Sequence, residues 1–390
     1  MIHAIQRVLR RAIVFGFNCA AKVLRQKPHL RGKEHLVKPP SPLIFTLTHD
    51  SYFEIPSLAK VYYSLKPKLD LLIMGKSDFL SGHYLATNYG KNNALLRFVL
   101  NLLDKTRLPR AIFRIMNVTT IHRPFVEHYQ KRKDEIKLEI SQQMKDIKEK
   151  ISSGISTVVF PEGTTWGFGG LKRIRSGVYQ LVDNTLRTAH RKVYLLPINV
   201  KVDGLVKGTK DVFINIGKPV FLKGARESFN RRLATLLTRL HTITFSQVAA
   251  YYVHYRAEVE KQASSFIEIS RDTMKGNIAA VVRALESKTK KGALPPIDPK
   301  LPDQKYLEKK INGFIKYCRK KGYLVGDGAG RDDSYCFDIG KIIASYPEKT
   351  YRKLNPLGFY ANELASLGSD KILDLYNKAL NGRKSTHAPG

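Results

Sequence analysis

Short apolar runs alternate with longer amphipathic stretches through residues 43–216 of the chain. Apolar runs bounded by turn-forming residues are typical of buried strands. The stretches between them carry apolar residues at helical spacing, which predicts covering helices. We therefore expect an α/β fold, a layered mixed sheet flanked by helices. The expected strands lie at residues 43–47, 69–74, 115–121, 155–160, 193–200 and 212–216.

The first residues form a different pattern, in which apolar and basic side chains share one amphipathic helix at about residues 3–25. Ile5 and Phe15 are among the apolar residues, and Arg10 and Arg11 are among the basic ones. Two interpretations remain open. The helix binds the interface of a membrane, or it packs on the rest of the protein with its arginines in water. No segment reaches the roughly 20 apolar residues that a membrane-spanning helix needs.

Beyond about residue 225 the strand signals become sparse and helical patterns dominate. A Pro-rich break at residues 292–302 interrupts them. We expect three parts in the chain. Residues 1–28 form an amphipathic membrane-associating helix, residues 29–244 form the sheet domain, and residues 245–390 form a helical C-terminal extension of unknown role.

A candidate catalytic pair follows the first expected strand, where the sequence turns polar before a helical pattern begins. His49 would then lie at the edge of an α/β sheet, where ligands usually bind. Glu54 is five residues further on, so its carboxylate can accept from one imidazole nitrogen and leave the other free as a base. The alternative is a capped turn, with Asp50 or Ser51 as the N-cap and Glu54 in the first turn.

A second motif, Phe-Pro-Glu-Gly-Thr at residues 160–164, follows a later strand. Together the two stretches resemble the signatures of the glycerolipid acyltransferase family. The family's Asn-His-x-Ser-x-x-Asp has Thr48 for Asn and Glu54 for Asp here, whereas its second signature is unaltered. The resemblance spans about residues 30–225. Weaker matches stand in the family's order at Lys76, at Ile121-His122-Arg123, and at residues 196–198 and 216–220.

The resemblance implies transfer of an acyl group from a thioester to a hydroxyl of a glycerol-phosphate acceptor, lysophosphatidic acid or glycerol 3-phosphate, in phospholipid biosynthesis. His49 is the implied general base, and Glu54 orients it. Arg123 is the implied phosphate ligand, because a guanidinium can grip phosphate with two hydrogen bonds. The remaining substrate-binding candidates are Ser51, Lys76, Glu162, Gly163 and Thr164. The co-substrate is acyl-coenzyme A or an acyl-carrier protein, and no metal or other cofactor is expected.

The charge of the chain agrees with anionic partners. There are 67 Lys and Arg residues against 33 Asp and Glu residues, so the net charge is +34. Such an excess suits an anionic membrane surface, phosphorylated substrates or nucleic acid. No nucleic-acid recognition motif stands out, which argues against the last of these. Three widely spaced cysteines form no disulfide framework and indicate a reducing compartment. We therefore expect a peripheral or monotopic protein on the cytoplasmic face of a membrane.

Three other functions stay open at this point. The departures at Thr48 and Glu54 are compatible with an enzyme of the same fold that acylates another lipid, such as an aminolipid or a lysophospholipid. They are also compatible with a non-catalytic lipid-binding scaffold. The high positive charge alone suggests a nucleic-acid-binding protein.

Overall fold

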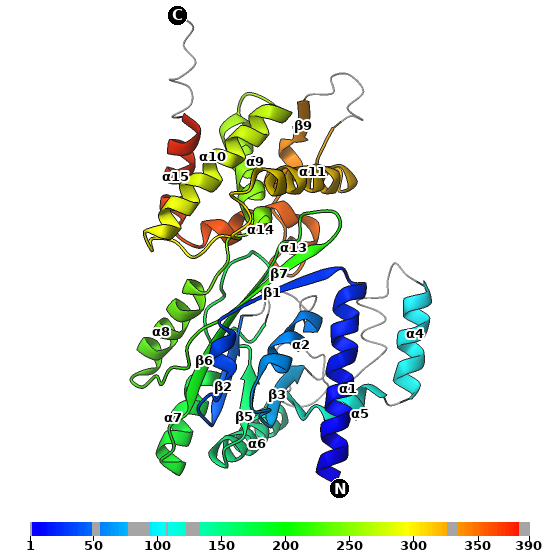
Figure 1. Ribbon diagram of the computed structural model, residues 1–390, viewed down its shortest axis with the longest axis vertical. Coiled ribbons are helices and arrows are strands. Elements are labelled where there is room, and N and C mark those ends of the chain that lie inside the picture. Colours follow the sequence, from blue (N-terminus) through cyan, green and yellow to red (C-terminus); the bar gives the residue numbers. More distant parts are fainter. Residues whose placement is uncertain are drawn as a thin grey trace, which may run out of the picture.

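The computed structural model describes residues 2–48, 55–76, 94–106, 108–121, 133–164, 166–325 and 334–381. Its centre is a seven-stranded sheet with the strand order β1-β7-β6-β2-β5-β3-β4 (Figure 1). Neighbouring strands are parallel except for the pair β6 and β7. The expected α/β class with a mixed sheet is confirmed. The strands are β1 (Gln26–Arg31), β2 (Leu43–Leu47), β3 (Leu71–Lys76), β4 (Val118–Ile121), β5 (Ser156–Val159), β6 (Tyr194–Val202) and β7 (Lys210–Ile216).

The central strand β2 shows why the apolar runs form the middle of the sheet. All five of its residues are buried. Ile44 joins the apolar core on one face, whereas Leu43 and Phe45 join the core on the other. A strand covered on both faces needs a continuous apolar run rather than an alternating one. Helix α2 (Ile55–Ser64) covers the face of Leu43, and α6 (Lys133–Ser152), α7 (Gly177–Ala189) and α8 (Arg226–Arg239) cover the face of Ile44.

Strand β1 is an element that the sequence pattern does not predict. Its sequence is polar and contains Pro28, which pairs with Val212 of β7 in the parallel register. Proline cannot donate a ladder hydrogen bond and is tolerated on an edge strand. Because β1 is the outermost strand beside β7, only one of its sides is paired. The expected strand at 115–121 is shorter than predicted, since helix α5 (Leu108–Ile115) occupies its first residue.

The N-terminal helix α1 (Ile2–Val23) packs on the protein along one face and is exposed along another. Val14 and Ala21 are buried where α1 packs on α2, α5 and β1. Val8 and Phe15 are 63% and 61% exposed on the same helix. One face of α1 therefore belongs to the protein, and apolar side chains remain on another face. Among the described residues, no helix combines the length and the apolar character that crossing a membrane requires.

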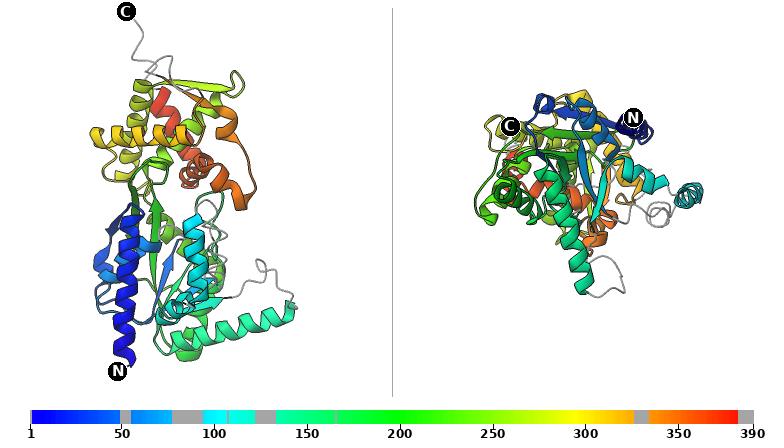
Figure 2. Two further views of the ribbon diagram at one scale, coloured as in Figure 1. Left: turned by 90° about the vertical axis from the view of Figure 1, so that its right-hand side faces the viewer. Right: turned by 90° about the horizontal axis from the view of Figure 1, so that it is seen from below.

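The C-terminal extension lies at one end of the sheet domain and has an apolar core of its own (Figures 1 and 2). Leu205 and Val206, from the loop after β6, also join this core. Residues 226–260 contain two helices, because Thr244 and Gln247 form a capping box that starts the second one. The elements are α9 (Phe245–Glu260), β8 (Phe266–Ser270), α10 (Arg271–Lys290), α11 (Gln304–Lys320), β9 (Ser334–Asp338), α12 (Ile339–Ile343), α13 (Glu348–Leu354), α14 (Pro356–Ala365) and α15 (Ser369–Asn381).

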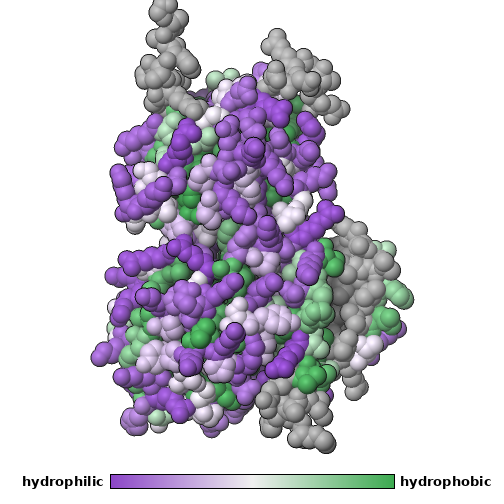
Figure 3. All heavy atoms as spheres, viewed as in Figure 1, coloured by the Kyte–Doolittle hydropathy of each residue, from purple (hydrophilic) through white to green (hydrophobic). Residues whose placement is uncertain are grey.

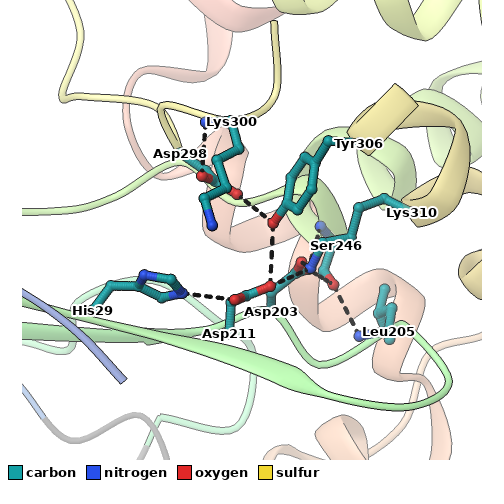
Figure 4. Close-up of polar contacts among 9 residues, drawn as sticks. All are labelled: His29, Asp203, Leu205, Asp211, Ser246, Asp298, Lys300, Tyr306 and Lys310. Carbon is teal, nitrogen blue, oxygen red and sulfur yellow. Dashed lines mark hydrogen bonds and ion pairs between the residues drawn. The ribbon is translucent and has the colours of Figure 1, made fainter. Parts of the chain in front are cut away.

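A buried cluster of charged residues joins the extension to the sheet (Figure 4). The ammonium of Lys310, on α11, lies 2.5 Å from Oδ2 of Asp203 and 2.6 Å from Oδ2 of Asp211. The other oxygen of Asp211 accepts a hydrogen bond of 2.6 Å from Nε2 of His29, on β1. Asp203 also accepts from the backbone N–H of Ser246, on α9, at 2.9 Å. We call Lys310, Asp203, Asp211 and His29 the anchor cluster.

Candidate functional site

The motifs of the sequence gather at one edge of the sheet. Strands β2, β3, β4 and β5 run parallel to one another, so their carboxyl ends lie at the same edge. Thr48 follows β2, Lys76 is the last residue of β3, and Ile121 is the last residue of β4. The Phe-Pro-Glu-Gly-Thr motif follows β5. The site candidates His49, Ser51, Glu54 and Arg123 lie outside the described residues.

Thr48 shows how the first motif is attached to the sheet. Its backbone N–H donates to the carbonyl of Ile198 at 3.0 Å, and its hydroxyl oxygen accepts from the N–H of Val200 at 2.9 Å. Thr48 is buried, with 5% of its surface exposed. The side chain thus continues the pairing of β2 with β6 by one residue. The residue that stands for the family's Asn fixes the chain immediately before His49.

The second motif forms a closed turn. The N–H of Gly163 donates to the carbonyl of Phe160, and the N–H of Arg175 donates to that of Pro161, both at 2.9 Å. Gly163 has φ of 73°, a left-handed conformation that favours glycine. A Cβ there would lie 2.8 Å from Cδ of Arg175, so glycine also lets this side chain approach.

Glu162, in this turn, points to the following loop and is 2% exposed. Its Oε2 accepts from the backbone N–H of Lys172 at 2.8 Å. The ammonium of Lys172 lies 3.2 Å from Oε1 of Glu348, on α13, and 4.6 Å from the ring centre of Trp166. Lys172 thus links this loop to the extension.

The loop after the second motif packs closely under the extension. Gly169 has φ of 93°, and a Cβ there would lie 2.4 Å from the carbonyl oxygen of Phe359 on α14. The ring of Phe168 meets that of Tyr351 edge to face, with 5.1 Å between their centres. The extension therefore touches the loop that continues the motif.

A cavity of about 270 Å³ lies between this edge of the sheet and α14. Thr48 and Glu162 line it on the motif side, and Asn199 and Lys201 of β6 line it below. Glu363 of α14, with Phe359, closes it from the extension. Among the described residues, no group of three His, Cys, Asp or Glu side chains is arranged to hold a metal ion.

One wall of the cavity is a buried chain of polar side chains. Lys201 forms an ion pair with Oε1 of Glu363, and Oε2 of Glu363 accepts from the amide of Gln247 at 2.9 Å. The amide oxygen of Gln247 lies 3.2 Å from Nε2 of His241. Since an amide oxygen can only accept, Nε2 of His241 carries the proton and Nδ1 is a hydrogen-bond acceptor. Burial, aided by the nearby charge of Lys201, lowers the pKa of His241 to about 3, so the imidazole is neutral.

The side-chain amide of Asn199 has a hydrogen-bond partner for its nitrogen but none for its oxygen among the described residues. Its Nδ2 donates to the carbonyl of Leu237, on α8, at 2.9 Å. Its Oδ1 is buried and has no hydrogen-bond partner among the described residues. A buried polar atom without a partner costs free energy unless a ligand or water satisfies it. Asn199 is therefore a cavity-wall residue with a buried acceptor that no described group satisfies.

The comparisons with known proteins decide the class of the chain. A family model described as Acyltransferase matches residues 27–201. These residues form an acyltransferase domain. The match confirms the resemblance to glycerolipid acyltransferases over these residues and supports an O-acyltransferase enzyme. The matched range ends at Lys201 and includes Thr48, Glu162 and Asn199 of the cavity wall.

One solved structure similar to this acyltransferase is the crystal structure of the 1-acyl-sn-glycerophosphate (LPA) acyltransferase PlsC from Thermotoga maritima. The sequence identity is 14%, and the TM-score is 0.39. The alignment covers 61% of this chain and 80% of that one. No curated protein matches the chain significantly.

Proposed function

We propose that the enzyme transfers a fatty acyl group from a coenzyme A or acyl-carrier-protein thioester to a hydroxyl of a glycerol-phosphate acceptor in phospholipid biosynthesis. Lysophosphatidic acid and glycerol 3-phosphate are the simplest acceptors of this class. The observation that supports the proposal is the cavity at the sheet edge. Its wall contains Glu162 of the second motif and Thr48, the residue before His49.

The reaction needs a base because a hydroxyl is a poor nucleophile at neutral pH. His49 takes the proton as the hydroxyl oxygen attacks the thioester carbonyl carbon. The tetrahedral centre then collapses, the carbon–sulfur bond breaks, and the leaving thiolate receives the proton. The products are an ester and a free thiol. Glu54 orients the imidazole and stabilises its protonated form.

The substrate groups are held by the other motif residues. Arg123 binds the phosphate with two hydrogen bonds, and Lys76 adds a second positive charge. Glu162 accepts a hydrogen bond from a hydroxyl of the acceptor, while Gly163 and Thr164 line the turn beside it. Ser51 is a further substrate-binding residue. No metal or redox cofactor is required for this chemistry.

Each of the three parts of the chain has its own role in this proposal. Residues 1–28 bind the anionic surface of a membrane, residues 29–244 carry out the transfer, and residues 245–390 complete the site. Exposed apolar residues support the membrane contact: Val8 and Phe15 on α1, and Phe98 and Leu102 on α4 (Ala94–Lys105). Helix α5 contacts both of these helices, and Figure 3 shows apolar surface on their side of the molecule. We call these four residues the apolar patch.

The test is an acyl-transfer assay with radiolabelled acyl-coenzyme A or acyl-carrier protein on anionic vesicles. Wild type and His49→Ala receive lysophosphatidic acid or glycerol 3-phosphate. We expect labelled product from the wild type and a rate lower by roughly 10²–10⁴ in the variant, which is the usual contribution of a general base. Undiminished turnover by a correctly folded His49→Ala protein would contradict the proposal.

A further inference from the structure

The Pro-rich segment before α11 brings a third carboxyl group to the anchor cluster (Figure 4). This group belongs to Asp298, which is 1% exposed. The hydroxyl oxygen of Tyr306, on α11, lies 2.9 Å from Oδ2 of Asp298 and 3.1 Å from Oδ2 of Asp211. One phenol oxygen is therefore within hydrogen-bond distance of two carboxyl groups, one from the extension and one from the central sheet.

These two contacts need two protons, and the phenol supplies one of them. A hydroxyl group has a single proton, so Tyr306 can donate to only one carboxyl group. Burial, together with the neighbouring carboxylates, raises the pKa of Tyr306, so the phenol keeps its proton. The other contact joins two oxygen atoms and requires a proton on the carboxyl group itself. Either Asp298 or Asp211 must then be a carboxylic acid.

The hydrogen-bond donors around the two groups assign this proton to Asp298. Asp211 accepts from Nε2 of His29 and from the ammonium of Lys310. Burial alone would raise the pKa of Asp211, but these hydrogen bonds lower it below its usual range, so Asp211 is ionised. Oδ1 of Asp298 accepts only from the backbone N–H of Lys300, at 3.0 Å, and no ion pair joins this carboxyl group to another described residue.

The charges around Asp298 also favour its neutral form. Asp203 and Asp211 of the sheet domain are close to it, and the ammonium of Lys310 is shared between those two carboxylates. The ammonium of Lys300 lies over the phenol ring, 5.9 Å from its centre. Burial and the two negative charges raise the pKa of Asp298 by more than its own hydrogen bonds lower it.

Asp298 also lies at the junction between the sheet domain and the extension. Its backbone N–H donates to the carbonyl of Ile243, and the N–H of Ile243 donates to the carbonyl of Pro296, both at 2.9 Å. Ile243 directly precedes Thr244, the N-cap of α9. The segment that carries Asp298 is thus hydrogen-bonded to the point where the chain passes into the extension.

We propose that Asp298 carries a proton that ties the extension to the sheet domain. Its O–H donates to the oxygen of Tyr306, whose own O–H donates to Asp211, and we call these three residues the proton latch. When the pH rises and this proton passes to water, two carboxylates face a single hydroxyl proton, and their repulsion loosens the extension. Since Glu363 of the extension lines the cavity, the pH then controls how firmly that wall is held. This regulation goes beyond the proposed function, because it concerns docking of the extension and not the acyl transfer.

Urea unfolding of the full chain tests the proton latch. A carboxyl group whose pKa is raised by folding stabilises the protein fully below its ordinary pKa of about 4, and this stabilisation is lost as the pH rises. Asp298→Asn has an amide that can donate to Tyr306 at every pH. From about pH 4 to about pH 8, the folding equilibrium constant of the wild type should fall about tenfold or more relative to that of Asp298→Asn. Asp370→Asn, at an exposed position of α15, should follow the wild type. A smaller relative change between wild type and Asp298→Asn would overturn the inference.

The proton and the docking can also be observed directly. At about pH 5.5 ordinary carboxyl groups are ionised. A carboxylic acid C=O band in the infrared difference spectrum between wild type and Asp298→Asn would therefore report this proton. Hydrogen exchange at the amides of residues 243 and 298, corrected for intrinsic rates, should show protection that decreases from about pH 5 to about pH 8 in the wild type only. Absence of the band, or the same pH dependence of exchange in both proteins, would overturn the inference. None of these measurements uses acyl transfer, so their outcome is independent of the proposed function.

Discussion

The ammonium of Lys310 lies 2.6 Å from the carboxylate of Asp211, although 99 positions separate the two residues in the chain. Asp211 belongs to the central sheet and Lys310 to the extension. Burial alone would raise the pKa of Asp211, but hydrogen bonds from His29 and Lys310 outweigh it and hold that pKa below its usual range. Asp211 is therefore ionised in a buried contact between the acyltransferase domain and the extension.

Removing the cation of the anchor cluster should destabilise the protein strongly. Lys310→Met leaves Asp203 and Asp211 buried without their partner, and breaking a buried pair in this way costs about 3–5 kcal/mol. We expect that decrease in the free energy of unfolding, measured by urea denaturation. The matched control is Lys309→Met, since Lys309 is exposed on the same helix. Equal stability of the two variants would contradict the structural role of Lys310.

The neutral state of His241 predicts a loss of stability in acid. The folded protein lowers the pKa of His241 to about 3, so it binds this proton less well than the unfolded chain does. The stabilisation of the folded protein by this lowered pKa is complete above about pH 6.5, the ordinary pKa of histidine. It decreases as the pH falls toward 3. His241→Gln keeps a donor for Gln247 and removes the titration. Between pH 7 and pH 4 the wild type should lose roughly 3 kcal/mol more than this variant. Parallel losses in both proteins would show that His241 does not titrate this way.

If His49 and Glu54 act as one unit, their substitutions should not be additive. Glu54→Gln keeps the size of the side chain but cannot stabilise an imidazolium, so we expect a rate loss of at least about tenfold. The double variant His49→Ala/Glu54→Gln should be no slower than His49→Ala alone. If the two substitutions instead lower the rate independently, so that their effects multiply, Glu54 does not take part in the proton transfer.

Membrane binding should depend on the apolar patch. Phe15→Asp puts a charge on the exposed side of α1, and a buried aromatic ring contributes about 1.5–3 kcal/mol. We expect at least tenfold weaker binding to vesicles that contain anionic lipid, measured by co-sedimentation. Leu138→Asp is the control, because Leu138 is 73% exposed on α6, which projects from another side of the molecule (Figure 2). Equal loss in both variants, or no loss in Phe15→Asp, would exclude the apolar patch as the contact.

Cutting the chain after residue 244 should not give a stable acyltransferase domain. The cut removes Lys310 and Glu363, the partners of Asp203, Asp211 and Lys201. It also exposes Leu205 and Val206, which are buried in the core of the extension. We expect an aggregated or partly unfolded product, tested by gel filtration and circular dichroism. A monomeric, cooperatively folded fragment with full turnover would refute the role given to the extension in completing the site.

The sequence predicted those parts of the fold that depend on local pattern. The run at 43–47 is apolar at every position except Thr46, and it forms a strand buried on both faces. Strand β1 was not predicted, because a polar sequence with Pro28 does not look like a strand. It is tolerated at the edge of the sheet beside β7, and that position depends on the tertiary structure.

The candidate site was likewise predicted only where the signal is local in the sequence. Glu162 was predicted from a contiguous motif, and it does line the cavity. Asn199 and Lys201 were missed, although two polar residues at alternate positions of an apolar strand are a signal for a buried polar contact. Glu363 lies in the apolar helix α14, 162 positions from Lys201, and nothing local links the two. Such contacts arise only when the fold brings distant elements together.

The ion pairs that Lys201 and Lys310 form between the sheet domain and the extension also predict a sequence difference among related acyltransferases. A lysine at position 201 is tolerated in the strand because Glu363 neutralises it, and acids at positions 203 and 211 because Lys310 does. Acyltransferases without such an extension should therefore carry uncharged residues at the positions equivalent to 201, 203 and 211. Gain or loss of the extension during evolution should leave coordinated changes at these sites. Charged residues at these three positions would then mark acyltransferase sequences that have, or once had, helices of the extension packed against the sheet.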